Sequence, residues 1–147
     1  MIEYIKTGYQ IIEKIKNDNL YKHAVKESLK REIIYNLDVI DSKNSAIDNC
    51  LIIKLLSTKF YDFLTSEMIS TKIIFEEDNK LVSTCDNNIQ NKSIKKWLRN
   101  IDTKDFLFDK VYIKIKVIKK LNDNGVIKRG DSLLYLKSLL ILLKQNF

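Results

Sequence analysis

The basic residues of this chain gather in one quarter of it, and their type and spacing point to binding. Residues 92–129 hold 12 Lys and Arg against four Asp and Glu, a net charge of +8. Residues 1–91 carry −2 and residues 130–147 carry +1, so that quarter accounts for the +7 of the whole chain. An AT-rich coding genome would raise Lys everywhere and does not explain this clustering. The candidate interaction residues are Lys92, Lys95, Lys96, Arg99, Lys110, Lys114, Lys116, Lys119 and Lys120.

The spacing of these residues suits a helical surface. Lys92, Lys95, Lys96 and Arg99 lie three or four residues apart, on one flank of a predicted helix. Such a surface can bind an acidic protein partner, follow nucleic-acid phosphates without reading sequence, or contact an anionic membrane surface. With only three arginines in the chain, specific base readout is disfavoured. The alternative to all of these is a solvated basic face that keeps the protein soluble.

No residue pattern indicates catalysis or metal binding. His23 is the only histidine, and with Glu27 one turn away it is typical of a surface pair. Three consecutive acids at 76–78 point in different directions and lack the spacing of a calcium loop. Phosphate-binding glycine loops, nucleophile elbows and zinc-ligand spacings are missing from the sequence. We therefore predict a protein that is not an enzyme and has no catalytic residues, metal site or cofactor.

The two cysteines are too few for a disulfide framework or a four-ligand zinc site. Cys50 falls on the apolar side of a predicted helix, so we expect it in the core. Cys85 lies in a polar segment with no basic group placed to activate it. Residues 1–15 mix charged with apolar side chains, unlike a signal peptide. These features favour a cytoplasmic protein.

Composition favours an all-α fold. The 147 residues contain no Pro and three Gly, too few for the many turns of a sandwich or barrel. The hydrophobic content of 45% and charged content of 31% are typical of a globular domain. We predict a single helical domain over residues 1–147, a bundle of five or six helices.

Three helices are predicted in the first half of the chain: residues 3–16, Leu20–Asp41 and Ala46–Ile69. The second has an apolar face formed by Val25, Leu29, Ile33, Leu37 and Ile40. Ala46–Ile69 has apolar residues on more than one side, so we expect one long central helix with two neighbours. We expect Leu20–Asp41 antiparallel on one side of it and Ser132–Gln145 on the other. Asn36 and Asn49 lie close to apolar faces, where buried Asn can fix helix register; exposure at an edge is the expectation for both.

The region at 70–92 has two interpretations, a small β-hairpin or an irregular excursion. A short helix is predicted at Ser93–Ile101. Residues 111–117 alternate as a strand would, but residues 107, 111, 115 and 118 also form a helical stripe. The stop at Asn124–Gly125 favours a helix that extends to about residue 122.

The last predicted helix, Ser132–Gln145, is apolar nearly all round. It is too short to cross a bilayer and contains Lys137, so no membrane span is predicted. Its apolar surface must be buried in this domain or against a partner, which makes it a candidate for homo-oligomer contact.

These observations favour a non-enzymatic protein-interaction module, a small subunit or adaptor of a larger assembly. A bacterial or phage defence, counter-defence or toxin-neutralising system is one such setting, by association rather than deduction. An acidic protein is the expected partner. The alternative function is a non-specific nucleic-acid-binding module that uses residues 92–129.

Overall fold

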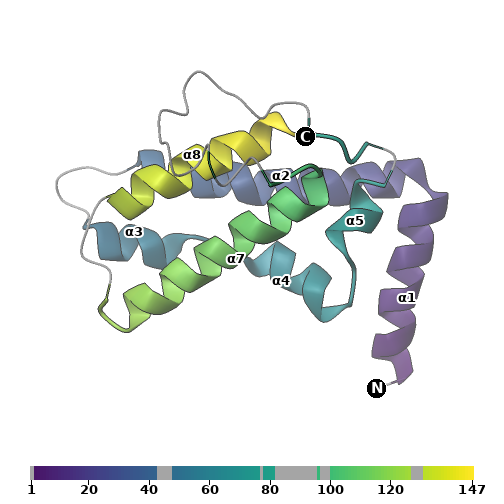
Figure 1. Ribbon diagram of the computed structural model, residues 1–147. Helices are drawn as coiled ribbons and strands as arrows, with labels where there is room; N and C mark the ends of the chain where they lie inside the picture. Colours follow the sequence, from purple (N-terminus) through teal and green to yellow (C-terminus); the bar gives the residue numbers. More distant parts are fainter. Residues whose placement is uncertain (1, 43–47, 77, 82–95, 97–99, 127–130) are drawn as a thin grey trace.

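Helices make up most of the chain that can be described. The computed structural model describes residues 2–42, 48–76, 78–81, 96, 100–126 and 131–147. Its helices, labelled as in Figure 1, are α1 (Ile2–Asn17), α2 (Asn19–Asp41), α3 (Asn49–Leu55), α4 (Lys59–Ser66), α5 (Thr71–Ile74), α7 (Lys104–Asp123) and α8 (Asp131–Gln145). These residues include no strand, only an isolated bridge between Lys80 and Thr103. The predicted all-α helical bundle is confirmed, and a hairpin is not seen in the described part of 70–92.

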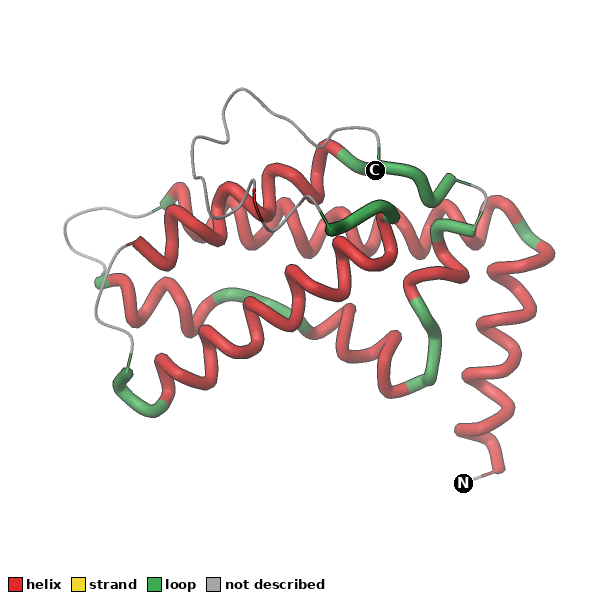
Figure 2. Tube along the Cα trace, viewed as in Figure 1, coloured by secondary structure: helices red, strands yellow, loops and turns green. Residues whose placement is uncertain are grey.

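The two longest helices, α2 and α7, organise the bundle. Helix α2 contacts α1, α3, α4, α5 and α8, and α7 contacts α3, α5 and α8. Helix α7 crosses the α3–α4 pair, and α8 lies along α2 (Figures 1 and 2). Helix α1 turns away from the start of α2, where the Asp18 carboxylate accepts hydrogen bonds from the backbone N–H groups of Leu20 and Tyr21. None of the described helices is both long and apolar enough to span a bilayer.

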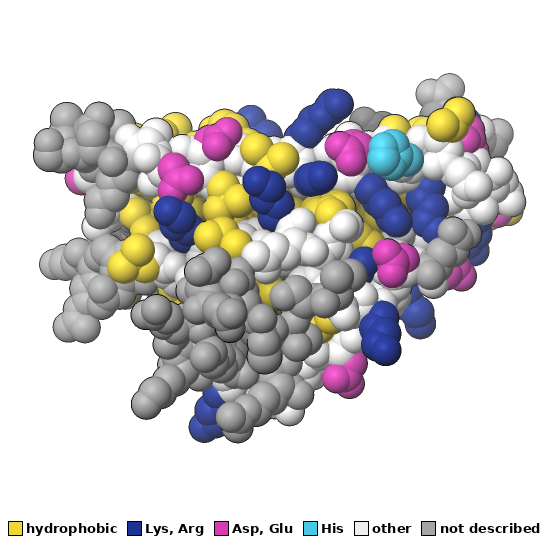
Figure 3. Space-filling model, turned by 90° about the horizontal axis from the view of Figure 1, so that it is seen from above, with side chains coloured by type: hydrophobic (Ala, Val, Ile, Leu, Met, Phe, Trp, Pro, Cys, Tyr) yellow, Lys and Arg dark blue, Asp and Glu magenta, His cyan; other side chains and the backbone are white. Residues whose placement is uncertain are grey.

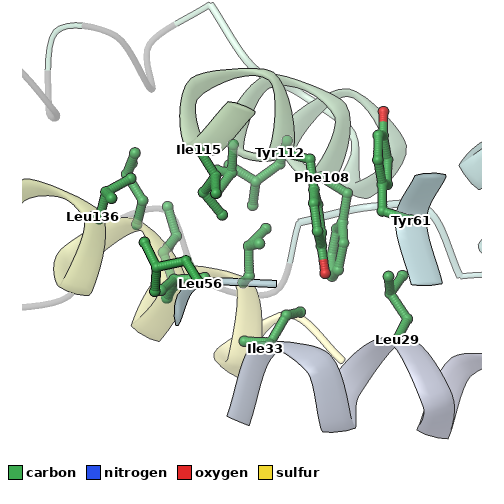
Figure 4. Close-up of a cluster of buried hydrophobic side chains, with 14 of the residues drawn as sticks. Leu29, Ile33, Leu56, Tyr61, Phe108, Tyr112, Ile115 and Leu136 are labelled. Atoms are coloured by element: carbon green, nitrogen blue, oxygen red, sulfur yellow. The ribbon is translucent and has the colours of Figure 1, made fainter. Parts of the chain in front are cut away.

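The core lies between α2, α7 and α8 (Figure 4). The predicted face of α2 is confirmed, since all five of its apolar residues are buried. The side chains labelled in Figure 4 come from α2, the α3–α4 link, α4, α7 and α8; they are Leu29, Ile33, Leu56, Tyr61, Phe108, Tyr112, Ile115 and Leu136. Each fully buried side chain of this kind contributes about 1.5–3 kcal/mol relative to exposure. The prediction of a single domain over 1–147 stays a prediction.

Two tyrosine rings stack within this core. The rings of Tyr61 and Tyr112 lie 4.3 Å apart between centroids and 6° from parallel. The Tyr61 hydroxyl donates a hydrogen bond to Asp109 Oδ1 at 2.8 Å, and Asp109 also accepts from the Thr71 hydroxyl at 3.1 Å. The pair therefore joins α4 to α7, and Thr71 connects the start of α5 to the same carboxylate.

The central stretch is two helices, so the prediction of one long helix over Ala46–Ile69 is wrong. Helix α3 ends at Leu55, α4 begins at Lys59, and Leu56 between them has extended backbone. The Asn36 amide of α2 donates to the Ser57 carbonyl at 2.9 Å and accepts from the Ser57 N–H at 2.7 Å. Asn36 is fully buried, which also corrects its expected exposure. These two bonds satisfy backbone groups that a continuous helix would have paired within itself.

A carboxylate of α2 also holds the start of α4. Thr58, the residue before α4, forms no side-chain capping bond. Instead the buried Glu32 accepts from the N–H groups of Phe60 and Tyr61, at 2.7 and 3.4 Å. A negative charge at this position also complements the helix dipole. Because Glu32 contacts Phe60 while Asn36 contacts Ser57, α2 runs antiparallel to this stretch, as predicted.

Helix α8 packs mainly against α2 and α7, not on the central stretch as expected. Six of its leucines are buried within the chain: Leu133, Leu136, Leu139, Leu140, Leu142 and Leu143. Leu134 remains 68% exposed. Most of the apolar surface of α8 is therefore satisfied internally, and a homo-oligomer through this helix stays a prediction.

Helix α7 covers Lys104–Asp123, so the strand interpretation of 111–117 is wrong. The start of α7 is held by Asn79, whose side chain accepts from the Asp105 N–H at 3.0 Å and donates to the Asp105 carboxylate at 2.9 Å. The buried Lys104 ammonium bonds Asp78 at 3.0 Å. Residues 78–80 are thus fixed to α7. Cys85 and most of the predicted helix Ser93–Ile101 lie outside the described residues.

Candidate interaction surface

The structure places five of the nine predicted basic residues on one helix, α7. They are Lys110, Lys114, Lys116, Lys119 and Lys120. Lys96 is described and exposed. Lys92, Lys95 and Arg99 lie outside the described residues, so the continuity of the basic surface beyond α7 stays a prediction.

The buried face of α7 determines which side chains point outward. Its six buried apolar residues are Leu107, Phe108, Val111, Tyr112, Ile115 and Ile118. On the opposite side, four large apolar side chains are exposed: Phe106 at 44%, Ile113 at 54%, Val117 at 48% and Leu121 at 39%. Their spacings of seven, four and four residues place them along one line of the helix. We call these four residues the α7 ridge.

Lysines flank the α7 ridge on both sides. On the α8 side, the Lys114 ammonium lies 5.6 Å from the ring centroid of Tyr135. On the α4 side, the Lys116 ammonium lies 2.8 Å from Asp62 Oδ1. Lys120 is exposed one turn beyond Lys116, and Lys110 lies 5.3 Å from the Phe106 ring at the start of the ridge. The outer face of α7 is therefore an apolar line between positive charges.

The Lys116–Asp62 ion pair reduces the free charge on one flank. Burial alone would raise the pKa of Asp62, but hydrogen bonds from Lys116 and Thr58 and the positive charge of Lys116 outweigh it, and the pKa is lowered. Both side chains are more than 40% exposed, so the pair contributes at most about 1 kcal/mol. Lys116 is therefore held in place without being removed from solvent.

Lys119 forms hydrogen bonds with the end of α3. Its ammonium donates to the carbonyl oxygens of Leu56 and Lys54, the latter at 3.3 Å. A cation at the C-terminal end of a helix satisfies unpaired carbonyls and complements the dipole. Of the five candidate lysines on α7, Lys119 thus bonds to the end of α3, while the other four lie around the α7 ridge.

Away from the α7 ridge, the described surface has a mixed distribution of charged and apolar side chains. On the face in Figure 3, basic, acidic and hydrophobic side chains are interspersed. His23 Nε2 and Glu27 Oε1 lie 4.0 Å apart with 72% and 39% of their side chains exposed, as a surface pair would. Cys50 is exposed, contrary to the expected core position. Within the described residues no group of three or more His, Cys, Asp or Glu could hold a metal ion.

Sequence reasoning missed the α7 ridge. The sequence does indicate a second apolar face, because apolar residues also occur on both sides of the helical stripe that begins at Leu107. The strand interpretation of 111–117 places Ile113 and Val117 on the same face as Val111 and Ile115, and so conceals a second apolar face. An amphipathic helix of a monomer carries one apolar face, so a second one on the outside marks a candidate contact surface.

The fold and this surface define a small all-α protein that presents an amphipathic, lysine-flanked helix on its exterior. Comparison with protein-family models, with curated proteins and with solved structures finds no match to this chain.

Proposed function

We propose that this chain is a non-enzymatic, intracellular interaction module that binds an acidic protein partner through the outer face of α7. Such a module would act as a small subunit or adaptor of a larger assembly. The observation that supports this proposal is the α7 ridge, four exposed apolar side chains between flanking lysines. A partner of opposite charge and matching apolar spacing would bury the ridge and pair with the lysines.

The chemistry of the surface suits an amphipathic acidic helix. Apolar anchors at helical spacing are the usual means by which a helix binds an apolar surface. Charges around such anchors accelerate association and discriminate between partners more than they add affinity. The ridge would therefore supply most of the affinity, and Lys110, Lys114 and Lys120 would supply the selectivity for acidic partners.

The test begins with affinity purification of the tagged chain from its native host, with partners identified by mass spectrometry. The affinity of the purified partner is then measured against two variants. Exchange of Lys110, Lys114 and Lys120 for Glu should weaken binding at least about tenfold at low salt and reverse its salt dependence. Ile113→Ser with Val117→Ser should weaken it comparably without changing the salt dependence.

The matched control reverses three exposed lysines on other helices, Lys16, Lys72 and Lys144. It carries the same change in net charge and should bind the partner with little loss. Recovery of the chain alone and monomeric from its host would contradict the proposal, as would equal loss of affinity in the control.

The alternative function, non-specific nucleic-acid binding, predicts different effects of the same variants. A random-sequence duplex would bind at low salt with a steep salt dependence, and the triple Glu variant would abolish that binding. The Ile113→Ser, Val117→Ser variant would bind the duplex as the original chain does. That outcome would favour the nucleic-acid alternative over the protein partner.

A further inference from the structure

A pocket of about 570 Å³ lies at the link between α3 and α4. Its walls come from Tyr35 of α2, residues 54–59 and Lys119 of α7. Three of these residues are lysines (Lys54, Lys59 and Lys119), and none of the described lining residues is acidic. The lining of this concave site is therefore positively charged, which favours an anionic ligand.

We propose that this pocket binds a phosphate dianion, as inorganic phosphate or as the phosphate group of a small monoester. Lysine is a common phosphate ligand because its ammonium is a compact charge with three donors. Three ammonium groups match a dianion with several terminal oxygens better than they match a single carboxylate. This proposal is independent of the α7 ridge, because Lys54 and Lys59 belong to different helices from the lysines that flank it.

The backbone of the pocket is held by buried contacts. Asn36 pairs with Ser57, and Glu32 holds the first amides of α4. The link between the helices is therefore fixed, with Lys54 before it and Lys59 after it. A fixed arrangement matters because lysine side chains lose substantial conformational entropy when they converge on a ligand.

The lysines of the pocket form no ion pair with a carboxylate in the described part of the chain, although the negative charge of Asp62 acts on Lys119. Glu32 is occupied by the amides of α4 and the Ser57 hydroxyl, and Asp62 by Lys116 and Thr58. Lys54 and Lys59 are exposed and form no ion pair within the described part of the chain. Lys119 already donates to two carbonyls and has one N–H left for a ligand.

The hydroxyl groups of Ser57 and Tyr35 already have hydrogen-bond partners, so the lysines would recognise the ligand. The Ser57 hydroxyl donates to Glu32 and accepts from the Lys59 N–H, and the Tyr35 hydroxyl donates to the Leu55 carbonyl. The Tyr35 ring and Leu55 are about half exposed at the edge of the pocket. An organic group attached to the phosphate could contact this apolar edge, whereas inorganic phosphate could not.

The experiment is a titration of the isotope-labelled chain with sodium phosphate, followed by amide NMR at constant ionic strength. We expect saturable shifts at residues 54–59. Exchange of Lys54 and Lys59 for Gln should weaken this binding at least about tenfold, because charge-assisted hydrogen bonds are lost. Exchange of Lys16 and Lys72 for Gln, at exposed positions of α1 and α5, removes the same charge elsewhere and should leave the affinity unchanged.

Two further arms identify the ligand class. Sodium acetate at the same ionic strength should give no saturable shift at 54–59. Tighter binding of phenyl phosphate than of inorganic phosphate would identify a monoester as the ligand, and equal affinity would identify free phosphate. Thermal unfolding gives a second readout, since phosphate should raise the Tm of the original chain and not that of the Lys54→Gln, Lys59→Gln variant.

Three outcomes would overturn the proposal. They are shifts at 54–59 that grow linearly without saturation, equal saturable shifts with acetate, and unchanged phosphate affinity in the Lys54→Gln, Lys59→Gln variant. Both exchanged residues are exposed, so without phosphate the variant should unfold at nearly the same Tm as the original chain. Lys119 is left in place because it caps α3.

Discussion

The Asn36 side chain forms two hydrogen bonds to the backbone of one residue, Ser57, in a fully buried position. An amide side chain has the same donor and acceptor as a peptide group, so it can replace a backbone partner. Here it substitutes for the helical bonds that are lost between α3 and α4. The path of the chain at this point depends on that single residue of α2.

Exchange of Asn36 for Ala should therefore destabilise the fold strongly. Both hydrogen bonds disappear and the partly buried N–H and carbonyl of Ser57 lose their partners, which together cost about 2–4 kcal/mol. Urea unfolding followed by circular dichroism measures the loss. Asn19→Ala, at an exposed position in the first turn of α2, is the control and should change stability by less than about 0.5 kcal/mol. Equal effects of the two substitutions would contradict this role of Asn36.

At the scale of secondary-structure elements, α3 is capped from a distant part of the chain. It has seven residues, too few to be stable as an isolated helix. Its start is capped by Asp48, whose carboxylate accepts from the Leu51 N–H at 3.0 Å. Its end is capped by Lys119 of α7. The formation of α3 thus depends on the placement of α7.

Lys119→Met tests this dependence. Methionine keeps a similar stem but lacks the ammonium, so the carbonyls of Lys54 and Leu56 lose their donor. We expect a loss of about 1 kcal/mol and faster hydrogen exchange of the α3 amides. Lys120→Met is the control, because the Lys120 side chain is exposed and bonds to none of the described residues. Unchanged exchange in α3 of the Lys119→Met chain would show that the cap is not needed.

Much of the helical pattern could be predicted from local sequence. Periodicity identified α2 with its buried face from Val25 to Ile40, and it placed the lysines of α7 on a helix. The break at Leu56–Thr58 could not be predicted, because Ser57 bonds to residues 21 and 25 positions away. Hydrophobic runs indicate only that a segment is buried, whereas the link is set by polar contacts that no local pattern records. The fold therefore has seven described helices where five or six were predicted.

The candidate site was predictable in composition but not in arrangement. The distribution of charge along the sequence identifies residues 92–129 as the basic quarter of the chain, and α7 carries five of the nine predicted basic residues. Their partners are far away in sequence: Lys116 bonds to Asp62 and Lys119 to the end of α3. The pocket at the α3–α4 link combines Lys119 with Lys54 and Lys59, from the stretch predicted to be one long central helix. Tertiary packing, rather than local sequence, brings these three charges together.

For the whole molecule, α8 connects the two organising helices. It contacts both α2 and α7, and its buried leucines lie between them. The Lys137–Asp41 ion pair, at 2.6 Å, joins α8 to the end of α2 on the surface. Because α8 is late in the sequence and α2 early, the core is complete only when distant parts of the chain have met.

Leu136→Ala should destabilise the whole fold, because this side chain is fully buried between α8 and its neighbours. Large-to-small changes in a core cost about 2–5 kcal/mol through lost burial and the cavity that remains. Leu134→Ala, two residues earlier at a 68% exposed position, should cost less than about 1 kcal/mol. Calorimetry of both variants measures the difference. A similar Tm for both would contradict the placement of α8.

The ionisation of the stacked tyrosines also allows unfolding to be followed by ultraviolet absorbance. Burial raises the pKa of both Tyr61 and Tyr112, reinforced by the hydrogen bond to Asp109 for Tyr61 and by the charge of Glu32 for Tyr112. The folded chain therefore keeps both phenols protonated above pH 10, where unfolded tyrosines ionise at a pKa of about 10. Because the folded pKa values are raised, stability is retained below that pH and declines as the pH rises above it.

Alkaline unfolding should consequently produce phenolate absorbance in the same step as the loss of helical circular dichroism. Tyr112→Phe removes one of the two stacked phenols and should reduce that absorbance step by one tyrosine. Exposed tyrosines such as Tyr9 ionise before unfolding, so the pair is followed as the difference in absorbance between the original chain and the Tyr112→Phe variant. A difference that appeared well before the helices were lost would contradict the burial of the pair. The stacked rings thus let an unlabelled sample report its own unfolding through the release of two phenolic protons.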